Sequence, residues 1–241
     1  MDLTRREAFG ALAVGSVALL QSQLASAAPA KPEPGKAEAG KHTPVPLPFD
    51  PKKLKGISEK LIVSHHDNNY AGAVNNLNKV EDELARVNKD TPGFLVSGLR
   101  ERELTFSNSR ILHELYFGNL GGSGKPGGAI EKALAERFSS LGRWEELFRA
   151  TGASLGGGSG WTVLAFNFHT GVLHTYWAGN HTQAVAFGAP LLVMDMYEHA
   201  YQMDYGAAAA KYIDAFFSNI QWEEVNRRFE RAQKAAAALR A

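Results

Sequence analysis

The segment DMYEHAY, residues 195–201, places a carboxylate and an imidazole four positions apart in an otherwise apolar part of the chain. Asp195 follows an apolar run, and burying a carboxylate costs free energy unless it is paired or coordinated to an ion. Imidazoles together with a carboxylate form a good ligand set for iron or manganese. Asp195 and His199 therefore suggest two ligands of a metal, provided that other segments supply the rest.

Three further histidines stand where they could supply the missing ligands. His65 and His66 are adjacent in an expected first helix, and His113 lies in the apolar segment ILHELYF. One such histidine alone is more often a core residue than a ligand. The chain contains no cysteine, which excludes thiolate zinc sites, disulfides and cysteine nucleophiles. Any metal must therefore be bound through nitrogen and oxygen.

The composition is that of an ordinary globular protein. Of the 241 residues, 44% are hydrophobic and 21% are charged, which is enough for a sizeable core. The formal net charge is +1, so the charge balance indicates neither nucleic acid nor an acidic surface as a partner.

Residues 1–27 have the pattern of an export signal. A pair of arginines precedes an uncharged apolar stretch, and small residues in an Ala-x-Ala pattern follow. The paired arginines favour the twin-arginine route, which carries folded proteins. The apolar stretch is too short to span a bilayer, so we expect a periplasmic or extracellular mature protein without a membrane anchor.

The remainder divides into a tether and two structural regions. Seven of the ten prolines lie between residues 28 and 51, which predicts a disordered tether over 28–50. Helical spacing and breakers predict an N-terminal helical hairpin domain over 51–122, with long helices near 57–87 and 93–117. Residues 123–241 should form an α/β domain with a small three-stranded antiparallel sheet, so the fold class is α+β.

Several shorter elements are expected in the second region. Two helices should lie near 129–139 and 144–154, followed by a β-hairpin that turns at His169-Thr170-Gly171. A further strand is expected at 191–196, a helical segment after it, and an amphipathic helix from Trp222 to the C-terminus.

Four segments are similar, in the same order, to the signature regions of the iron/manganese superoxide dismutase family. They are HHDNNYAGAVNNLN (65–78), HELYFGNL (113–120), GSGWTVL (158–164) and DMYEHAY (195–201). LPFDPKKLKGIS (47–58) resembles the N-terminal arm of the family, and IQWEEVNRRF (220–229) resembles its C-terminal helix. The resemblance covers roughly residues 46–230, nearly the whole expected mature domain.

The resemblance implies a metal centre and an activity. His65, His113, Asp195 and His199 would bind one iron or manganese ion per subunit, with water or hydroxide as a fifth ligand. The activity would be conversion of superoxide to dioxygen and hydrogen peroxide. The resemblance also implies a homodimer, with a tetramer as an alternative, in which Glu198 reaches the final ligand histidine of the partner subunit.

The residues around this implied centre depart from the family pattern. Asn69 and Ala73 stand where a histidine and a tyrosine would line the superoxide channel, and Gln202 replaces a tyrosine after the last ligand. Asn69 would then face Gln202 across the dimer interface. Tyr197 stands in place of a tryptophan beside the metal, while Trp161 is retained.

One side chain must also hydrogen-bond the metal-bound solvent, because such a bond helps to set its pKa. The family uses a glutamine or a histidine from one of two places. The place near Ser109 has no glutamine, whereas AGNHTQ offers His181 as the best match and Gln183 as the alternative. Tyr70 and Tyr116 would help to wall the cavity, although core packing explains both equally well.

Two alternatives to superoxide dismutation follow from these departures. The missing channel tyrosine opens the cavity and could redirect the chemistry toward a peroxidase type, or the protein could be a metal-binding relic without activity. Arg227 and Arg228 are candidates for steering the anionic substrate toward the site. The sequence does not choose between iron and manganese.

Overall fold

A computed structural model describes residues 40–183 and 185–240, without the side chain of Arg240. The predicted signal peptide and the first part of the predicted tether lie outside the described residues. The described residues belong to one compact unit, in which the two regions expected from the sequence pack together. No helix within the described ranges is long and apolar enough to cross a membrane.

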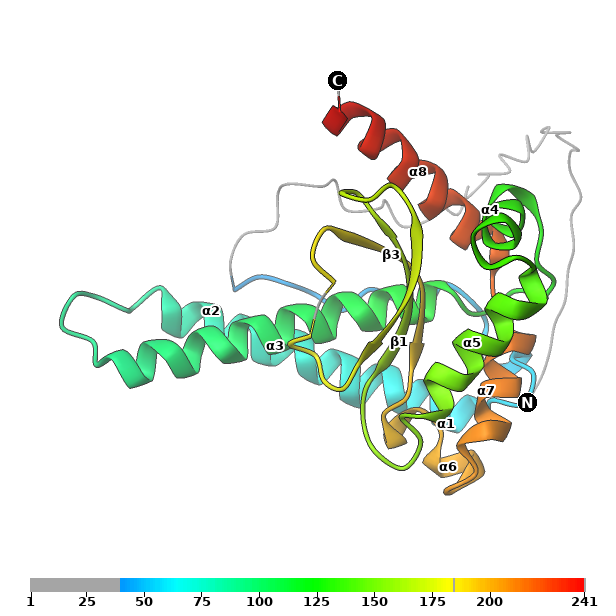
Figure 1. Ribbon diagram of the computed structural model, residues 1–241. Helices are drawn as coiled ribbons and strands as arrows, with labels where there is room; N and C mark the ends of the chain where they lie inside the picture. Colours follow the sequence, from blue (N-terminus) through cyan, green and yellow to red (C-terminus); the bar gives the residue numbers. More distant parts are fainter. Residues whose placement is uncertain (1–39, 184, 241) are drawn as a thin grey trace, which may run out of the picture. The chain divides into compact units, whose positions relative to one another are not determined.

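A helical hairpin forms the first region (Figure 1). It consists of α1 (Glu59–Ser64), a π-helix (His65–Tyr70), α2 (Ala71–Leu84) and α3 (Gly93–Gly118), and α2 packs along α3. Ser58 caps α1 by accepting a hydrogen bond from the backbone N–H of Leu61 at 3.1 Å. The expected first helix is therefore present, but its middle turn is wider than an α-helical turn.

The second region begins with two helices and continues into the sheet. Helices α4 (Gly128–Phe138) and α5 (Leu141–Ala153) precede β1 (Trp161–Asn167), β2 (Leu173–Ala178) and β3 (Gly188–Asp195). The strand order is β2-β1-β3 and both pairings are antiparallel, which confirms the predicted three-stranded sheet. The sheet lies between the C-terminal part of α3 and helix α5 (Figure 1).

The hairpin turn between β1 and β2 lies where the sequence predicts it. The side-chain oxygen of Asn167 accepts hydrogen bonds from the backbone N–H groups of His169 and Thr170, both at 3.0 Å. Gly171 follows with a φ of 73°, a left-handed conformation that favours glycine. These local contacts close the turn and fix the register of the two strands.

The chain after β3 is helical in short pieces. A 3-10 helix (Glu198–Ala200), α6 (Gln202–Tyr205), α7 (Ala209–Ser218) and α8 (Trp222–Arg240) follow one another. Gly206, with a φ of 53°, ends α6 and separates it from α7. The expected single helical segment after β3 is thus interrupted, because a left-handed residue cannot continue a right-handed helix.

The predicted tether is wrong at its C-terminal end, since residues 40–46 dock on the helical hairpin and Leu47 and Phe49 pack against the core. The amide side chain of Asn78, on α2, accepts from the backbone N–H of His42 at 2.8 Å and donates to its carbonyl oxygen at 2.9 Å. Asp50 then caps the 3-10 helix Pro51–Lys53. The prolines in this stretch therefore stiffen a docked segment rather than a disordered one.

Candidate metal centre

Four side chains from four separate elements meet at one point. His65 begins the π-helix, His113 lies near the end of α3, Asp195 ends β3, and His199 lies in the following 3-10 helix. One ligand atom from each lies within 4.8 Å of all the others. Oδ2 of Asp195 is 3.1 Å from Nε2 of His65, 3.3 Å from Nε2 of His199 and 3.6 Å from Nε2 of His113.

A backbone hydrogen bond sets the orientation of His113. Its Nδ1 donates to the carbonyl oxygen of Ser109, one helical turn earlier, at 2.7 Å. With the proton on Nδ1, the lone pair of Nε2 is available to a metal. Nε2 is buried and has no hydrogen-bond partner among the described residues, so the position leaves it unsatisfied without an ion.

In His65, two ring nitrogens rather than one are left without a hydrogen-bond partner in the described part of the chain. Both of them are buried. Its Nε2 approaches Oδ2 of Asp195 without the alignment of a hydrogen bond, as two ligands of one ion do. A buried polar atom left unpaired costs about 1–3 kcal/mol. Three imidazole nitrogens and one carboxylate oxygen therefore fit a single iron or manganese ion.

The protonation states of His113, His65 and Asp195 suit metal binding. Burial lowers the pKa of His113 to about 3 and also lowers the pKa of His65. Burial alone would raise the pKa of the Asp195 carboxyl, but the adjacent His199 and His65 outweigh it and hold that pKa below its ordinary value. Neutral imidazoles and an ionised carboxylate are the states that coordinate a metal.

The end of β3 holds Asp195 rigidly. Its Oδ1 accepts from the backbone N–H of Tyr197 at 2.9 Å, and its carbonyl oxygen accepts from the hydroxyl of Tyr212 at 2.8 Å. In the sheet, Asp195 pairs with Trp161 on β1. The register of the sheet therefore places the predicted carboxylate and the predicted tryptophan next to each other.

Aromatic rings surround the histidines. The ring centroid of Trp161 lies 5.1 Å from that of His113, and the centroid of Tyr116 lies 5.2 Å from that of His65. Tyr70 lies 6.2 Å from His113. These three predicted residues are brought to the centre together with Phe117, at 5.2 Å from His65, which the sequence reasoning missed.

His181 lies beside the cluster, with its ring centroid 6.2 Å from that of His113. Nε1 of Trp161 donates to Nδ1 of His181 at 2.9 Å. The imidazole stacks on Tyr197, with centroids 4.7 Å apart and planes at 11°, and Tyr197 in turn stacks on His199 at 5.4 Å. Gln183 is exposed and accepts from a backbone N–H of its own loop, so its side-chain oxygen is already engaged there.

The donor pattern at His181 follows from its contact with the tryptophan. An indole N–H can only donate, so Nδ1 of His181 accepts and its proton resides on Nε2. Burial lowers the pKa of His181, which keeps the imidazole neutral near pH 7. His181 therefore has one remaining donor, the Nε2–H group.

The remaining predicted residues lie around this cluster at various depths. Asn69 is half-buried in the π-helix that begins with His65, and Ala73 is buried one turn further on. Glu198 and Gln202 are exposed. The contact of Asn69 with Gln202 and the role of Glu198 require a second subunit and stay predictions.

The structure contradicts one of the two arginine candidates for substrate steering. Arg228 is largely shielded from solvent, with its side chain 10% exposed, and this desolvation lowers its pKa to about 10. Its guanidinium donates to Oδ1 of Asn119 at 2.6 Å, to Oε1 of Glu224 at 3.0 Å and to two backbone carbonyl oxygens. Arg228 therefore ties α8 to α3 and β3 instead of attracting an anion. Arg227 is half-exposed and pairs with Glu224.

Comparison with known proteins agrees with this centre. A family model described as "iron/manganese superoxide dismutases, C-terminal domain" matches residues 126–228. An iron superoxide dismutase of Cupriavidus metallidurans is 48% identical over 188 residues, which cover 78% of this chain and 95% of that protein. An iron superoxide dismutase of Aquifex aeolicus is 37% identical (79% and 92% covered). The manganese superoxide dismutase 1 of Halobacterium salinarum is 33% identical (78% and 94% covered). The chain belongs to the iron/manganese superoxide dismutase family.

Proposed function

We propose that the protein is a superoxide dismutase with one iron or manganese ion per subunit. The observation that carries this proposal is the buried cluster of His65, His113, Asp195 and His199, whose donor atoms lie within 4.8 Å of one another. The bound ion supplies one-electron redox chemistry. One superoxide loses an electron and leaves as dioxygen, and a second gains one electron and two protons and leaves as hydrogen peroxide.

The residues of the chain hold the centre and regulate access to it. The Ser109 carbonyl and the backbone N–H of Tyr197 orient His113 and Asp195. The side chain of His199 is 26% exposed, whereas those of the other three ligands are at most 2% exposed. Superoxide would therefore reach the centre from the side of His199, while the opposite side is closed by aromatic rings.

His181 would hold the proton that faces the metal-bound solvent. Its Nδ1 is engaged by Trp161, so Nε2–H is the group that can donate. The stacking of His181 on Tyr197, and of Tyr197 on His199, puts the His181 ring on the same side as the most exposed ligand, which supports this role. A donor there would hold a proton and deliver it to the departing product.

We further infer a homodimer and export by the twin-arginine route to the periplasm. Glu198 and Gln202 are both exposed beside His199, which suits an interface at this face. Size-exclusion chromatography with light scattering of the wild type and of Glu198→Ala tests the dimer, and a monomeric wild type would contradict it. Fractionation of cells that express the full chain, with Arg5 and Arg6 changed to lysine as the comparison, tests the export route.

The activity is tested on purified full-length protein by metal analysis, a superoxide assay and a peroxide-dependent oxidation assay. We expect about one iron or manganese ion per chain, because the cluster offers a single set of four ligand atoms. We also expect dismutation to be faster than peroxide-dependent oxidation. His113→Ala should lose both metal and activity. His169→Ala removes an exposed histidine in the β1–β2 turn and should retain both. Full activity in His113→Ala would overturn the assignment.

A further inference from the structure

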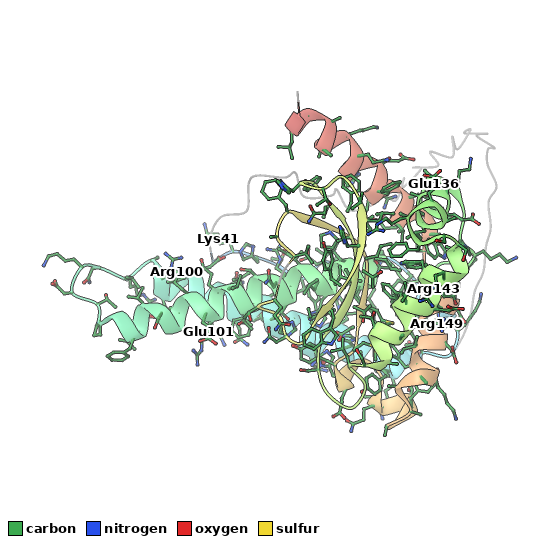
Figure 2. The ribbon with its side chains drawn as sticks, viewed as in Figure 1. Lys41, Arg100, Glu101, Glu136, Arg143 and Arg149 are labelled. Carbon is green, nitrogen blue, oxygen red and sulfur yellow. The ribbon has the colours of Figure 1, made fainter. Side chains whose placement is uncertain are left out.

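An extended segment ahead of the first helix lies against the helical hairpin, and we call residues 40–46 the strap. Figure 2 shows Lys41 of the strap beside the hairpin. The backbone N–H of Gly40 donates to the carboxylate of Glu81, and both backbone groups of His42 are bound by the amide of Asn78. The beginning of the strap is thus bound to one face of α2.

The side chain of His42 connects α2 with α3. Its Nε2 lies 3.1 Å from both carboxylate oxygens of Glu81 on α2, and its Nδ1 lies 2.8 Å from the guanidinium of Arg110 on α3. Since a guanidinium can only donate, Nδ1 accepts and Nε2–H donates to Glu81. With the side chain only 9% exposed, these are well-shielded polar contacts.

The same set of contacts continues to the tyrosine at the end of the π-helix. Nε of Arg110 donates to Oε1 of Glu114 at 2.9 Å, and the hydroxyl of Tyr70 donates to the same oxygen at 3.0 Å. A connected series of hydrogen bonds therefore runs from the strap through α3 to Tyr70, which is fully buried.

Val45 binds both ends of the π-helix through its backbone. Its N–H donates to the Tyr70 hydroxyl at 2.8 Å, and its carbonyl oxygen accepts from Nε2 of His66, also at 2.8 Å. His66 follows His65 directly, and Tyr70 is the last residue of the π-helix. The prolines on either side of Val45 fix their own φ angles and thereby limit the conformations of the strap.

The π-helix needs such support because no hydrogen bond to the ring of His65 is present among the described residues. A π-helical turn is rare, and its geometry persists only where the surrounding structure maintains it. His113 has the Ser109 carbonyl to set its ring, whereas neither nitrogen of His65 has a hydrogen-bond partner among the residues described. The direction of the His65 ring therefore depends on its backbone and on the rings packed around it.

We propose that the strap is a positioning element of the metal centre, which holds the π-helix through Val45 and so keeps His65 directed at the metal. The inference rests on the proposed iron or manganese centre. Its consequence is that metal retention depends on residues some twenty positions ahead of the first ligand. Loosening the strap should release the metal faster without unfolding the hairpin.

The test uses full-length, metal-loaded protein and two variants that leave Val45, the π-helix and the ligands unchanged. His42→Ala combined with Asn78→Ala removes the contacts that bind the beginning of the strap. Asn75→Ala, an exposed position on the same helix, is the matched control. The readouts are hydrogen exchange of residues 40–47 and 65–70, the rate of metal release to a chelator, and helical circular dichroism.

We expect the double variant to exchange faster in both segments and to release its metal about 10–100-fold faster, the usual effect of losing support around a ligand. Its circular dichroism and the behaviour of Asn75→Ala should match the wild type. Val45→Pro removes the N–H that donates to Tyr70 while leaving His42 and Asn78 unchanged, and it carries the test if the double variant does not fold. The proposal would be overturned by a folded variant whose strap amides exchange hydrogen freely but whose metal is released at the wild-type rate. A wild type that binds neither iron nor manganese would instead refute the proposed function.

Discussion

Replacing His181 tests how the chain supplies a proton beside the metal centre. Trp161 donates to Nδ1 of His181 at 2.9 Å, and burial keeps the imidazole neutral by lowering its pKa. One acceptor and one donor are thus arranged on opposite sides of the ring. A glutamine at position 181 has the same pattern, because its oxygen can accept from the indole while its amide nitrogen donates.

The two substitutions should therefore differ sharply. We expect His181→Ala to lower the dismutation rate per bound metal by about 10–100-fold, the usual cost of removing a group that supports a metal site. It also leaves the buried indole N–H of Trp161 without an acceptor, which should lower the free energy of unfolding by about 1–3 kcal/mol. His181→Gln should keep most of the activity and most of the stability.

The assay is stopped-flow decay of superoxide, divided by the metal content of each preparation, with urea unfolding measured in parallel. His169→Ala controls for the loss of a histidine from another loop of the same region, the β1–β2 turn. A wild-type rate per metal in His181→Ala would refute the assignment of this residue. If the dismutation rate per metal fell equally in His181→Gln and His181→Ala, one donor and one acceptor would not be sufficient at position 181. The site would then require the imidazole ring itself.

Three further outcomes follow from the structure. Arg228→Met should lower the free energy of unfolding by about 3–5 kcal/mol, because Asn119 and the other partners of Arg228 lose their hydrogen-bond donor. The free energy of unfolding of Arg228→Lys should lie between those of Arg228→Met and the wild type, and urea unfolding measures all three. In the metal-free protein, the pKa of His113 is lowered from 6.5 to about 3, so the unfolded chain binds more protons between these values. Urea midpoints should therefore fall as the pH drops from about 6.5 toward 3, and a flat profile would contradict this. Gly122→Ala should destabilise the protein, since the added Cβ would collide with the backbone oxygen of Ile220. Gly98→Ala on α3 should stabilise it by roughly 1 kcal/mol, and thermal unfolding measures both effects.

Patterns that extend over several residues of one element could be predicted from the sequence. Alternation and the His169-Thr170-Gly171 turn predicted the β-hairpin because side-chain periodicity and turn geometry are local properties. Asp195 could be singled out because a carboxylate after an apolar strand is costly to bury. Joining it to His65 and His113 required the family resemblance, since the spacing of residues in different elements carries no signal of their contact.

The sequence could not show which backbone groups support the centre. The Ser109 carbonyl orients His113, but a backbone carbonyl has no residue-type signature. HHDNNY has the spacing of an ordinary helix, and its π-helical form appears only in the folded chain. Likewise, Pro-rich residues 40–46 have the composition of a tether, and their docking depends on contacts with Asn78 and Tyr70 that lie far along the chain.

The strap and the predicted export route are mutually consistent. The twin-arginine route carries folded proteins, so a metal acquired before export must be held while the signal peptide is still attached. The predicted signal ends at residue 27 and the strap begins at residue 40, so removal of the signal leaves every strap contact in the mature chain. A centre whose first ligand depends on the strap would therefore have the same support before and after the signal is cleaved.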